Sequence, residues 1–262
     1  MAGTEWAGTE RLIVQPRDRE FLLELATMRV VDHAQARLVA GFGSTSRTNK
    51  RLLKLVRAGL LRRFFLGSGG GRKALYALSE KGAFLANVPL RGPRRAQGVL
   101  IAADYFVEHQ LQVNAIYLTA KFGANAHIRF GRWIAFNKPV APAIKLIPDG
   151  YVEFLTPTGT LAAFVEVDLG NESLAIWREK TRKYVELALS GEYRRIFGHD
   201  RFRVLVIANS ERRMLSLRKT IAAITEKIFR FGTFEDASAR FFSSVWLRPV
   251  GPEPETLFEQ PQ

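Results

Sequence analysis

Apolar positions near the start of the chain repeat at the spacing of helix faces. In the stretch RDREFLLELATM, residues Phe21, Leu22, Leu25 and Met28 fall on one face, which predicts a first helix. Asp32 precedes HAQARLVA and can cap a second helix, because its carboxylate can accept a hydrogen bond from an amide of the first turn. The following GFG is typical of a helix end.

A third helix is predicted to begin at Ser44 or Thr45 and to run to about Ala58, where Gly59 stops it. The second and third helices, joined by a short Gly-containing turn, form a helix-turn-helix unit. The apolar runs LLRRFFL and KALYALS flank a flexible GSGGG and predict a two-stranded hairpin. This order resembles winged-helix DNA-binding domains over about residues 16–87, most closely in RLLKLVRAGLLRR and YALSEKG.

The pattern changes near residue 90. Prolines and glycines in NVPLRGPRRAQG mark a basic linker at residues 89–96. Helices are expected at about Gln97–Gln110, Glu172–Leu189 and Glu211–Phe231, with NAIYLTAKFG as a further helical or mixed piece. Strands are expected in HIRFGRWIAF, AIKLIPDGYVEFL, TLAAFVEVDLG, RVLVIAN and FFSSVWL, with TPTGT as a turn between the second and third.

Strands that alternate with helices indicate an α/β layer whose sheet is at least partly parallel. The predicted fold class is therefore α/β, or α+β, with an N-terminal winged helix at residues 11–88 and an α/β domain with a mixed sheet at residues 97–250. The Pro- and Glu-rich GPEPETLFEQPQ, residues 251–262, is expected to be a flexible tail.

Composition narrows the function classes. The chain has 262 residues, is 47% hydrophobic and carries a net charge of +14, which favours a polyanionic partner, with nucleic acid before an acidic membrane surface. It contains no cysteine, which excludes disulfides, thiolate zinc sites and cysteine nucleophiles. The sequence offers neither a signal peptide nor the roughly 18 to 20 apolar residues of a membrane span, so we expect a soluble cytoplasmic protein.

Positive charge is concentrated in the predicted winged helix. Between His33 and Ser79 the sequence has no acidic residue and ten basic ones: Arg37, Arg47, Lys50, Arg51, Lys54, Arg57, Arg62, Arg63, Arg72 and Lys73. Such a surface gains salt-sensitive affinity for DNA by releasing counterions. A solvated basic face used for protein contacts is the alternative.

The third helix is the candidate recognition helix. Arg47, Asn49, Lys50 and Arg51 occupy its first turns, where a docked helix meets base edges, and Lys54 follows on the same helix. The other predicted DNA contacts lie before this helix, at the wing and in the linker: Arg37, Arg72, Lys73, Arg94 and Arg95.

Three carboxylates are placed where strands could bring them together. Asp149 begins one predicted strand, and Glu166 and Asp168 are two apart on the next, so their side chains share a face. Neighbouring carboxylates repel each other, and Mg²⁺ or Mn²⁺ could neutralise all three as ligands. Lys180 falls on a helix face with apolar neighbours such as Trp177, where a solvated lysine is not expected.

PDG at 148–150 and EVD at 166–168 resemble the motif of the restriction-endonuclease-like nuclease superfamily, which is Pro-Asp, a gap, then Asp or Glu, any residue, and Lys. Of EVD, only Glu166 matches the motif, at its acidic position, because Asp168 stands where the motif has lysine. Some members carry that lysine on the following helix, so the resemblance implies Lys180, or else Lys183, beside the catalytic acids Asp149, Glu166 and Asp168. The structural alternative is that these acids cap turns or pair with arginines.

The whole layout, with EHQLQVNAIYLTAK, PDG, EVD and KTRKY after a winged helix and an Arg-rich linker, resembles the replication-relaxation family over roughly residues 12–210. That resemblance implies a double-stranded DNA-binding protein of a plasmid, phage or other mobile element that acts in replication or its control. A Mg²⁺-dependent endonuclease and a winged-helix transcription regulator remain as alternatives, so catalysis stays open. The expected partners are DNA, a second copy of the chain, and replication or transfer proteins of the same element, with no membrane.

Overall fold

The computed structural model describes residues 12–66, 73–91, 100–123 and 127–258, and of residues 100–104 it describes only the helical backbone. The chain divides into two units, Met1–Leu111 and Gln112–Gln262. Within the described ranges, no helix has both the length and the apolar content needed to cross a bilayer.

The first unit is a winged helix, as predicted. Its elements are α1 (Pro16–Met28), β1 (Val31–Asp32), α2 (His33–Val39), α3 (Thr45–Arg57), β2 (Leu61–Leu66), β3 (Lys73–Leu78) and α4 (Glu80–Ala86). The strands form an antiparallel sheet in the order β1-β3-β2. The sequence predicted only the β2–β3 hairpin, because β1 is two residues long and carries no periodicity of its own.

Local chemistry fixes the ends of these helices. Asp32 Oδ1 accepts a hydrogen bond from Gln35 N at 2.9 Å, and Ser44 Oγ accepts one from Arg47 N at 3.3 Å, so both predicted caps are present. Gly59 follows α3 with φ at 73°, a conformation that glycine adopts without steric cost. The helices then bury their apolar faces in one core that includes Phe21, Leu22, Leu25, Leu52 and Leu55.

A single helix, α5 (Leu100–Phe122), crosses the boundary between the two units. The sequence predicted two pieces here and a boundary at residues 89–96, but α5 contains no Gly or Pro that would end it. Its buried residues are shared between two cores: Val107 and Leu111 cluster with Val30 and Leu75, and Val113, Ile116 and Ala120 cluster with the second unit. The described part of the chain therefore divides between Leu111 and Gln112.

The second unit contains a mixed seven-stranded sheet in the order β10-β9-β8-β7-β6-β5-β4. β6 pairs in parallel with β7, and β7 with β8, whereas the outer pairs are antiparallel. The strands are β4 (Arg129–Ile134), β5 (Gly150–Thr156), β6 (Gly159–Asp168), β7 (Arg203–Ala208), β8 (Phe229–Thr233), β9 (Trp246–Leu247) and β10 (Pro254–Glu255). The predicted α/β class with a mixed sheet is confirmed.

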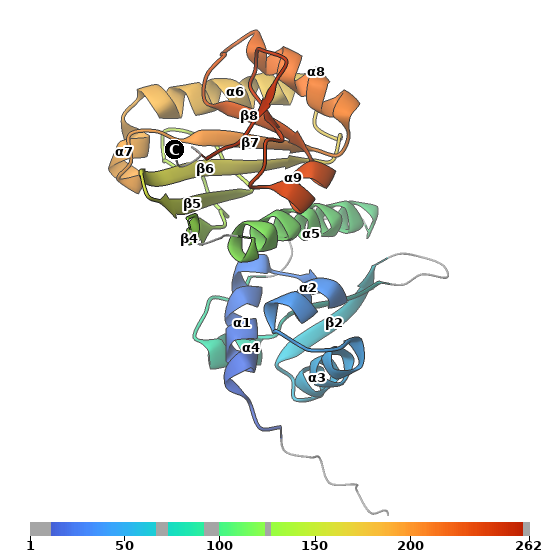
Figure 1. Ribbon diagram of the computed structural model, residues 1–262. Coiled ribbons are helices and arrows are strands. Elements are labelled where there is room, and N and C mark those ends of the chain that lie inside the picture. Colours follow the sequence, from blue (N-terminus) through green and yellow to red (C-terminus); the bar gives the residue numbers. More distant parts are fainter. Residues whose placement is uncertain (1–11, 67–72, 92–99, 124–126, 259–262) are drawn as a thin grey trace, which may run out of the picture. The chain divides into compact units, whose positions relative to one another are not determined.

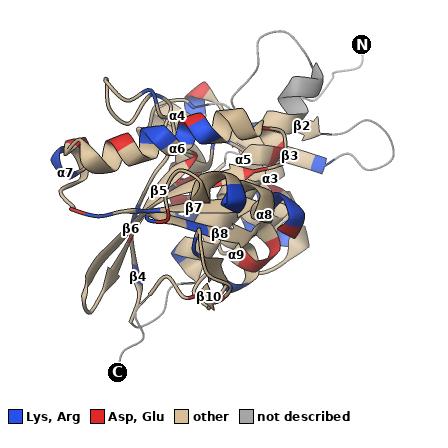
Figure 2. Cartoon of the chain, turned by 90° about the horizontal axis from the view of Figure 1, so that it is seen from above, with Lys and Arg blue, Asp and Glu red and all other residues tan. Residues whose placement is uncertain are grey.

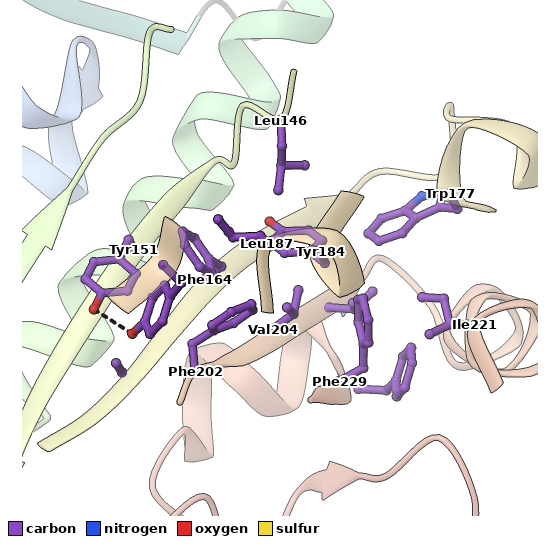
Figure 3. Packing of buried hydrophobic residues seen from close by; sticks show 14 of the residues in the cluster. Leu146, Tyr151, Phe164, Trp177, Tyr184, Leu187, Phe202, Val204, Ile221 and Phe229 are labelled. Atoms are coloured by element: carbon purple, nitrogen blue, oxygen red, sulfur yellow. Dashed lines mark hydrogen bonds between the residues drawn. The ribbon is translucent and has the colours of Figure 1, made fainter. Parts of the chain in front are cut away.

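Helices cover both faces of this sheet (Figure 1). One face packs against α6 (Leu174–Leu189), α7 (Glu192–Phe197) and α8 (Glu211–Ala222), and the other against the second half of α5 and α9 (Phe234–Arg240). Figure 3 shows the first of these cores, which contains Trp177 and Tyr184 of α6 together with Phe164 and Val204 of the sheet. Side chains of β6 with even numbers point into this core.

Several predictions for the C-terminal third are wrong. The helix expected over Glu211–Phe231 ends at Ala222, because Phe229 and Phe231 belong to β8, which pairs with β7. The last predicted strand, FFSSVWL, is reduced to the two residues of β9.

Of the expected flexible tail at residues 251–262, the part up to residue 258 lies within the described residues and contributes to the fold. Pro254 and Glu255 form β10 and pair with β9. Leu257 and Phe258 are buried, because their apolar side chains join the core on the α5 and α9 face of the sheet.

Candidate functional site

The exposed face of α3 carries a row of positive charge. Thr48, Leu52 and Leu55 are buried against the rest of the first unit. The opposite face exposes Arg47, Lys50, Lys54 and Arg57, which are spaced three, four and three residues apart and therefore line up along one side of the helix. Asn49 is exposed as well, so the described recognition-helix candidates, apart from Arg51, face solvent.

Arg51 points into the winged helix. Its Nε donates to Asp18 Oδ1 at 2.9 Å and its guanidinium also donates to the carbonyl oxygen of Ile13 at 2.8 Å. The Asp18 side chain is 0% exposed and that of Arg51 is 13% exposed. Arg51 was predicted to contact DNA, but in this structure it joins α3 to α1.

The remaining predicted DNA contacts fall into two groups. Arg37 is exposed on α2, and Lys73 at the start of β3 pairs with Asp32 at 2.6 Å while about half of its side chain stays exposed. Arg72, Arg94 and Arg95 lie outside the described residues.

In the second unit, Asp149, Glu166 and Lys180 come together where β5 and β6 lie side by side. Gly150 at the start of β5 is paired with Val165, which places Asp149 next to Glu166. Asp149 Oδ2 accepts a hydrogen bond from Val167 N at 2.9 Å. Lys180 Nζ, on α6, donates to Glu166 Oε2 at 3.0 Å. The lysine that the sequence placed on the following helix thus reaches the acid on β6.

Glu166 is a buried carboxylate with two strong donors. It is 1% exposed and also accepts a hydrogen bond from the Tyr184 hydroxyl at 2.6 Å. Burial raises the pKa of Glu166 to about 7, although the Lys180 ammonium and the Tyr184 hydroxyl both act to lower it.

Lys180 keeps its proton in this environment. Burial alone would lower the pKa of Lys180, but the nearby carboxylates of Glu166, Asp149 and Glu172 outweigh it and raise the pKa. Its ammonium also lies 3.0 Å from Glu172 Oε1 and 5.0 Å from the centre of the Trp177 ring. Lys180 is therefore a charged lysine held between carboxylates.

Asp168 does not join this group. Arg213 Nε and Nη2 donate to its two carboxylate oxygens at 2.8 and 2.9 Å, and Trp177 Nε1 donates at 2.7 Å. Burial would raise the pKa of Asp168, but the hydrogen bonds from Arg213 and Trp177 lower it below its usual range. Asp168 is thus an ion-paired acid of the core, as the structural alternative from the sequence proposed.

The arrangement does not fit the predicted set of three metal ligands. The described residues include no cluster of three or more His, Asp or Glu side chains able to hold an ion. Both oxygens of Asp168 are taken up by Arg213, and both oxygens of Glu166 are taken up by Tyr184 and Lys180. A cation at Asp149 and Glu166 would first require the Lys180 ammonium to leave Glu166.

Sequence reasoning missed Glu172 and Arg213 and did not assign Tyr184 a partner. Figure 2 shows the basic residues along α6 and α8, the helices from which Lys180 and Arg213 reach the acids. Lys180 could be found because its spacing from Trp177 and Tyr184 places it on a buried helix face. Arg213 carries no such signal, since it is 45 residues from Asp168 and meets it only in the folded sheet.

Comparisons with known proteins bear on this chain in three ways. No curated protein matches it significantly. Among solved structures, the restriction endonuclease FokI aligns with 84% of this chain at 11% identity and a TM-score of 0.31. The match takes in 43% of the FokI chain, so the present chain spans less than half of that protein.

The family comparison covers most of the features described above. The sequence model of the family described as replication-relaxation matches residues 22–199. That range includes α3 with its cationic row and the residues Asp149, Glu166 and Lys180. The chain therefore belongs to the replication-relaxation family.

Proposed function

We propose that this protein binds double-stranded DNA through α3 of its winged helix and acts in the replication, or the control of replication, of a mobile element. The row formed by Arg47, Lys50, Lys54 and Arg57 on the exposed face of α3 carries the proposal. Membership of the replication-relaxation family supports the link to replication.

The row suits a duplex for physical reasons. Each phosphate that a basic side chain neutralises releases condensed counterions, and four such contacts would give a slope of about −3.6 for log affinity against log salt concentration. Arg47 and Asn49, in the first two turns, can also make bidentate contacts to base edges in the major groove. The first turns of α3 would then contact the bases, while Lys54 and Arg57 contact the phosphates of the DNA backbone.

Fluorescence anisotropy with a labelled duplex tests the proposal over a range of salt concentrations. We expect binding at low salt that weakens steeply as salt rises, and a shallower slope when Lys54 and Arg57 are both changed to Ala. Arg178→Ala, which removes an exposed cation from α6 in the second unit, is the matched control and should leave the slope unchanged. A flat salt response in the unmodified protein would refute DNA binding by this surface.

A metal-dependent endonuclease is the second candidate. The position of Lys180 beside Glu166, next to Asp149, favours it, because a lysine and two acids are what the nuclease motif combines. Mg²⁺ or Mn²⁺ is the cofactor that this candidate requires. The hydrogen bonds of Glu166 argue against it as long as Lys180 and Tyr184 occupy both carboxylate oxygens.

A plasmid assay separates the two candidates. Supercoiled plasmid is incubated with the protein and Mg²⁺ or Mn²⁺, in parallel with Asp149→Ala and Glu166→Ala. Glu179→Ala, which removes an exposed carboxylate of α6 outside the cluster, is the control. Nicking that both site variants lose and the control retains supports the endonuclease; DNA retention without cleavage supports the binding protein or a winged-helix transcription regulator.

The proposed setting is the cytoplasm, with a homodimer on DNA and with further replication or transfer proteins of the same element as partners. A dimer is the ordinary state of a site-specific helix-turn-helix protein because its two copies read two half-sites. Analytical ultracentrifugation with and without duplex DNA measures the oligomeric state directly.

A further inference from the structure

A cavity of about 720 Å³ opens at the end of the sheet where β6, β7 and β8 begin. Its wall includes Thr160 of β6, Arg203 of β7 and Arg230 of β8, together with Leu257 and Phe258, which follow β10. This is the opposite end of β6 from Glu166, so the cavity is separate from the acids already described. Its volume lies within the range of about 300 to 1,000 Å³ that is typical of small-molecule sites.

The cavity wall is strongly basic. Five cationic residues line it against two acidic ones, Asp200 and Glu226: the cations are Arg201, Arg203, Lys227, Arg230 and Arg248. Arg248 is partly neutralised, because its Nε donates to Glu255 at 2.7 Å. The cations of the wall outnumber its carboxylates, so the cavity favours an anion.

Arg230 is the residue most in need of an anionic partner. Its Nη1 donates to the carbonyl oxygen of Phe229, but its Nε is buried and has no hydrogen-bond partner among the described residues. A buried donor without an acceptor is costly, and more so when it is charged. Burial, together with the like charges of Arg203 and Arg248, lowers the pKa of Arg230 to about 10, although the carboxylate of Glu255 acts to raise it, so the group is charged at neutral pH and lies near two like charges.

The backbone beside this arginine is also unusual. Ile228 lines the cavity and has a φ of 21°, outside the regions that a β-branched residue ordinarily adopts. Conformations of this kind cost energy and are concentrated at functional sites and ligand clamps. The backbone of Ile228 and the side chain of Arg230 both point to this part of the wall as a binding site.

We propose that this cavity binds the phosphate group of a nucleotide, either free or at the end of a nucleic-acid strand, with Arg230 as its central ligand. A guanidinium matches the oxygens of a phosphate through paired N–H donors, and a phosphate would supply the acceptor that Arg230 Nε lacks. Its negative charge would also offset the repulsion among the three arginines. The proposal does not rest on DNA binding by α3, since every wall residue belongs to the second unit.

Isothermal titration of the full chain with pyrophosphate, at an ionic strength held constant with chloride, tests the proposal. We expect saturable binding. Arg230→Gln should weaken this binding about tenfold to a hundredfold, because it removes one charged hydrogen bond to the phosphate. Lys227→Gln, which removes an exposed cation of the same wall, provides a second variant should Arg230→Gln fail to fold, and it should weaken binding in the same direction.

Arg212→Gln is the matched control, because it removes an exposed arginine at the other end of the sheet, at the start of α8. Pyrophosphate binding that both cavity variants weaken and the control retains supports the site. No binding by the unmodified protein, or equal binding in all variants, overturns it. Titrations with ATP, and with an oligothymidylate that carries or lacks a 5′-phosphate, then distinguish the sources. Binding of ATP indicates a free nucleotide. Binding of the oligothymidylate only when it carries the 5′-phosphate indicates the end of a strand.

Discussion

Replacement of Arg51 by Ala should destabilise the winged helix far more than replacement of its exposed neighbours. The substitution removes both donors that Arg51 gives to Asp18 and leaves that fully buried carboxylate with the Gln15 amide at 2.7 Å. Breaking a buried ion pair by removing one partner costs about 3–5 kcal/mol. That is a large part of the roughly 5–15 kcal/mol that stabilises a folded domain.

Hydrogen exchange measured by mass spectrometry can localise this loss. Trp133, Trp177 and Trp246 all belong to the second unit, so in a Trp6→Phe background the tryptophan fluorescence follows that unit. In Arg51→Ala, amides of α1 and α3 should exchange about a hundredfold to several thousandfold faster, because the free energy of local opening falls by the cost of the broken pair. Peptides from α6 and the fluorescence transition should not change.

Arg47→Ala is the control, since it removes an exposed cation from the same helix. The double variant of Asp18→Ala with Arg51→Ala should be less destabilised than the two single effects added together, because the residues interact directly. The reasoning fails if α3 exchanges equally slowly in Arg51→Ala and Arg47→Ala while both lose affinity for DNA. Arg51 would then act as a DNA contact, as its position in the sequence suggested.

Three further predictions concern single features. Gly150→Ala should lower the unfolding free energy of the second unit by about 1–3 kcal/mol in urea titrations, since the new Cβ would lie 2.2 Å from the Trp133 ring. Because the pKa of Asp168 is lowered in the folded protein, its ion pair stabilises the fold at pH values above the ordinary pKa of 3.8, and this stabilisation is lost as the pH falls through the lower native pKa. Urea denaturation curves of Asp168→Asn should therefore lack this part of the decrease in unfolding free energy at acid pH. Arg47→Ala with Lys50→Ala should reduce the slope of log affinity against log salt by about 2 without changing the hydrogen exchange of α3, and an unchanged slope would place the phosphate contacts elsewhere.

The parts of the fold that could be predicted from the sequence are those set by neighbours along the chain. The helices around α3 follow from apolar spacing and from capping side chains within three residues, such as Ser44. Lys180 could be expected near Glu166 because α6 directly follows β6, which limits where its buried face can lie.

What the sequence did not predict depends on partners far apart in the chain. Arg51 and Asp18 are 33 residues apart, and only packing of α3 on α1 turns that arginine away from solvent. The apolar residues Phe229 and Phe231 of β8 suit the end of a helix as well as a strand, and pairing with β7 selects the strand. The cavity around Arg230 likewise forms from strand ends and a C-terminal segment that periodicity cannot connect.

The continuity of α5 determines where the protein can be divided for separate study. A fragment that stops at the Pro- and Gly-rich stretch would lack Val107 and Leu111 and so uncover the apolar surfaces of Val30 and Leu75. One that starts within the helix must supply new capping for its exposed amide groups. Overlapping fragments that both retain residues 100–122 offer each half its own copy of the shared helix, and are the better starting point for expression.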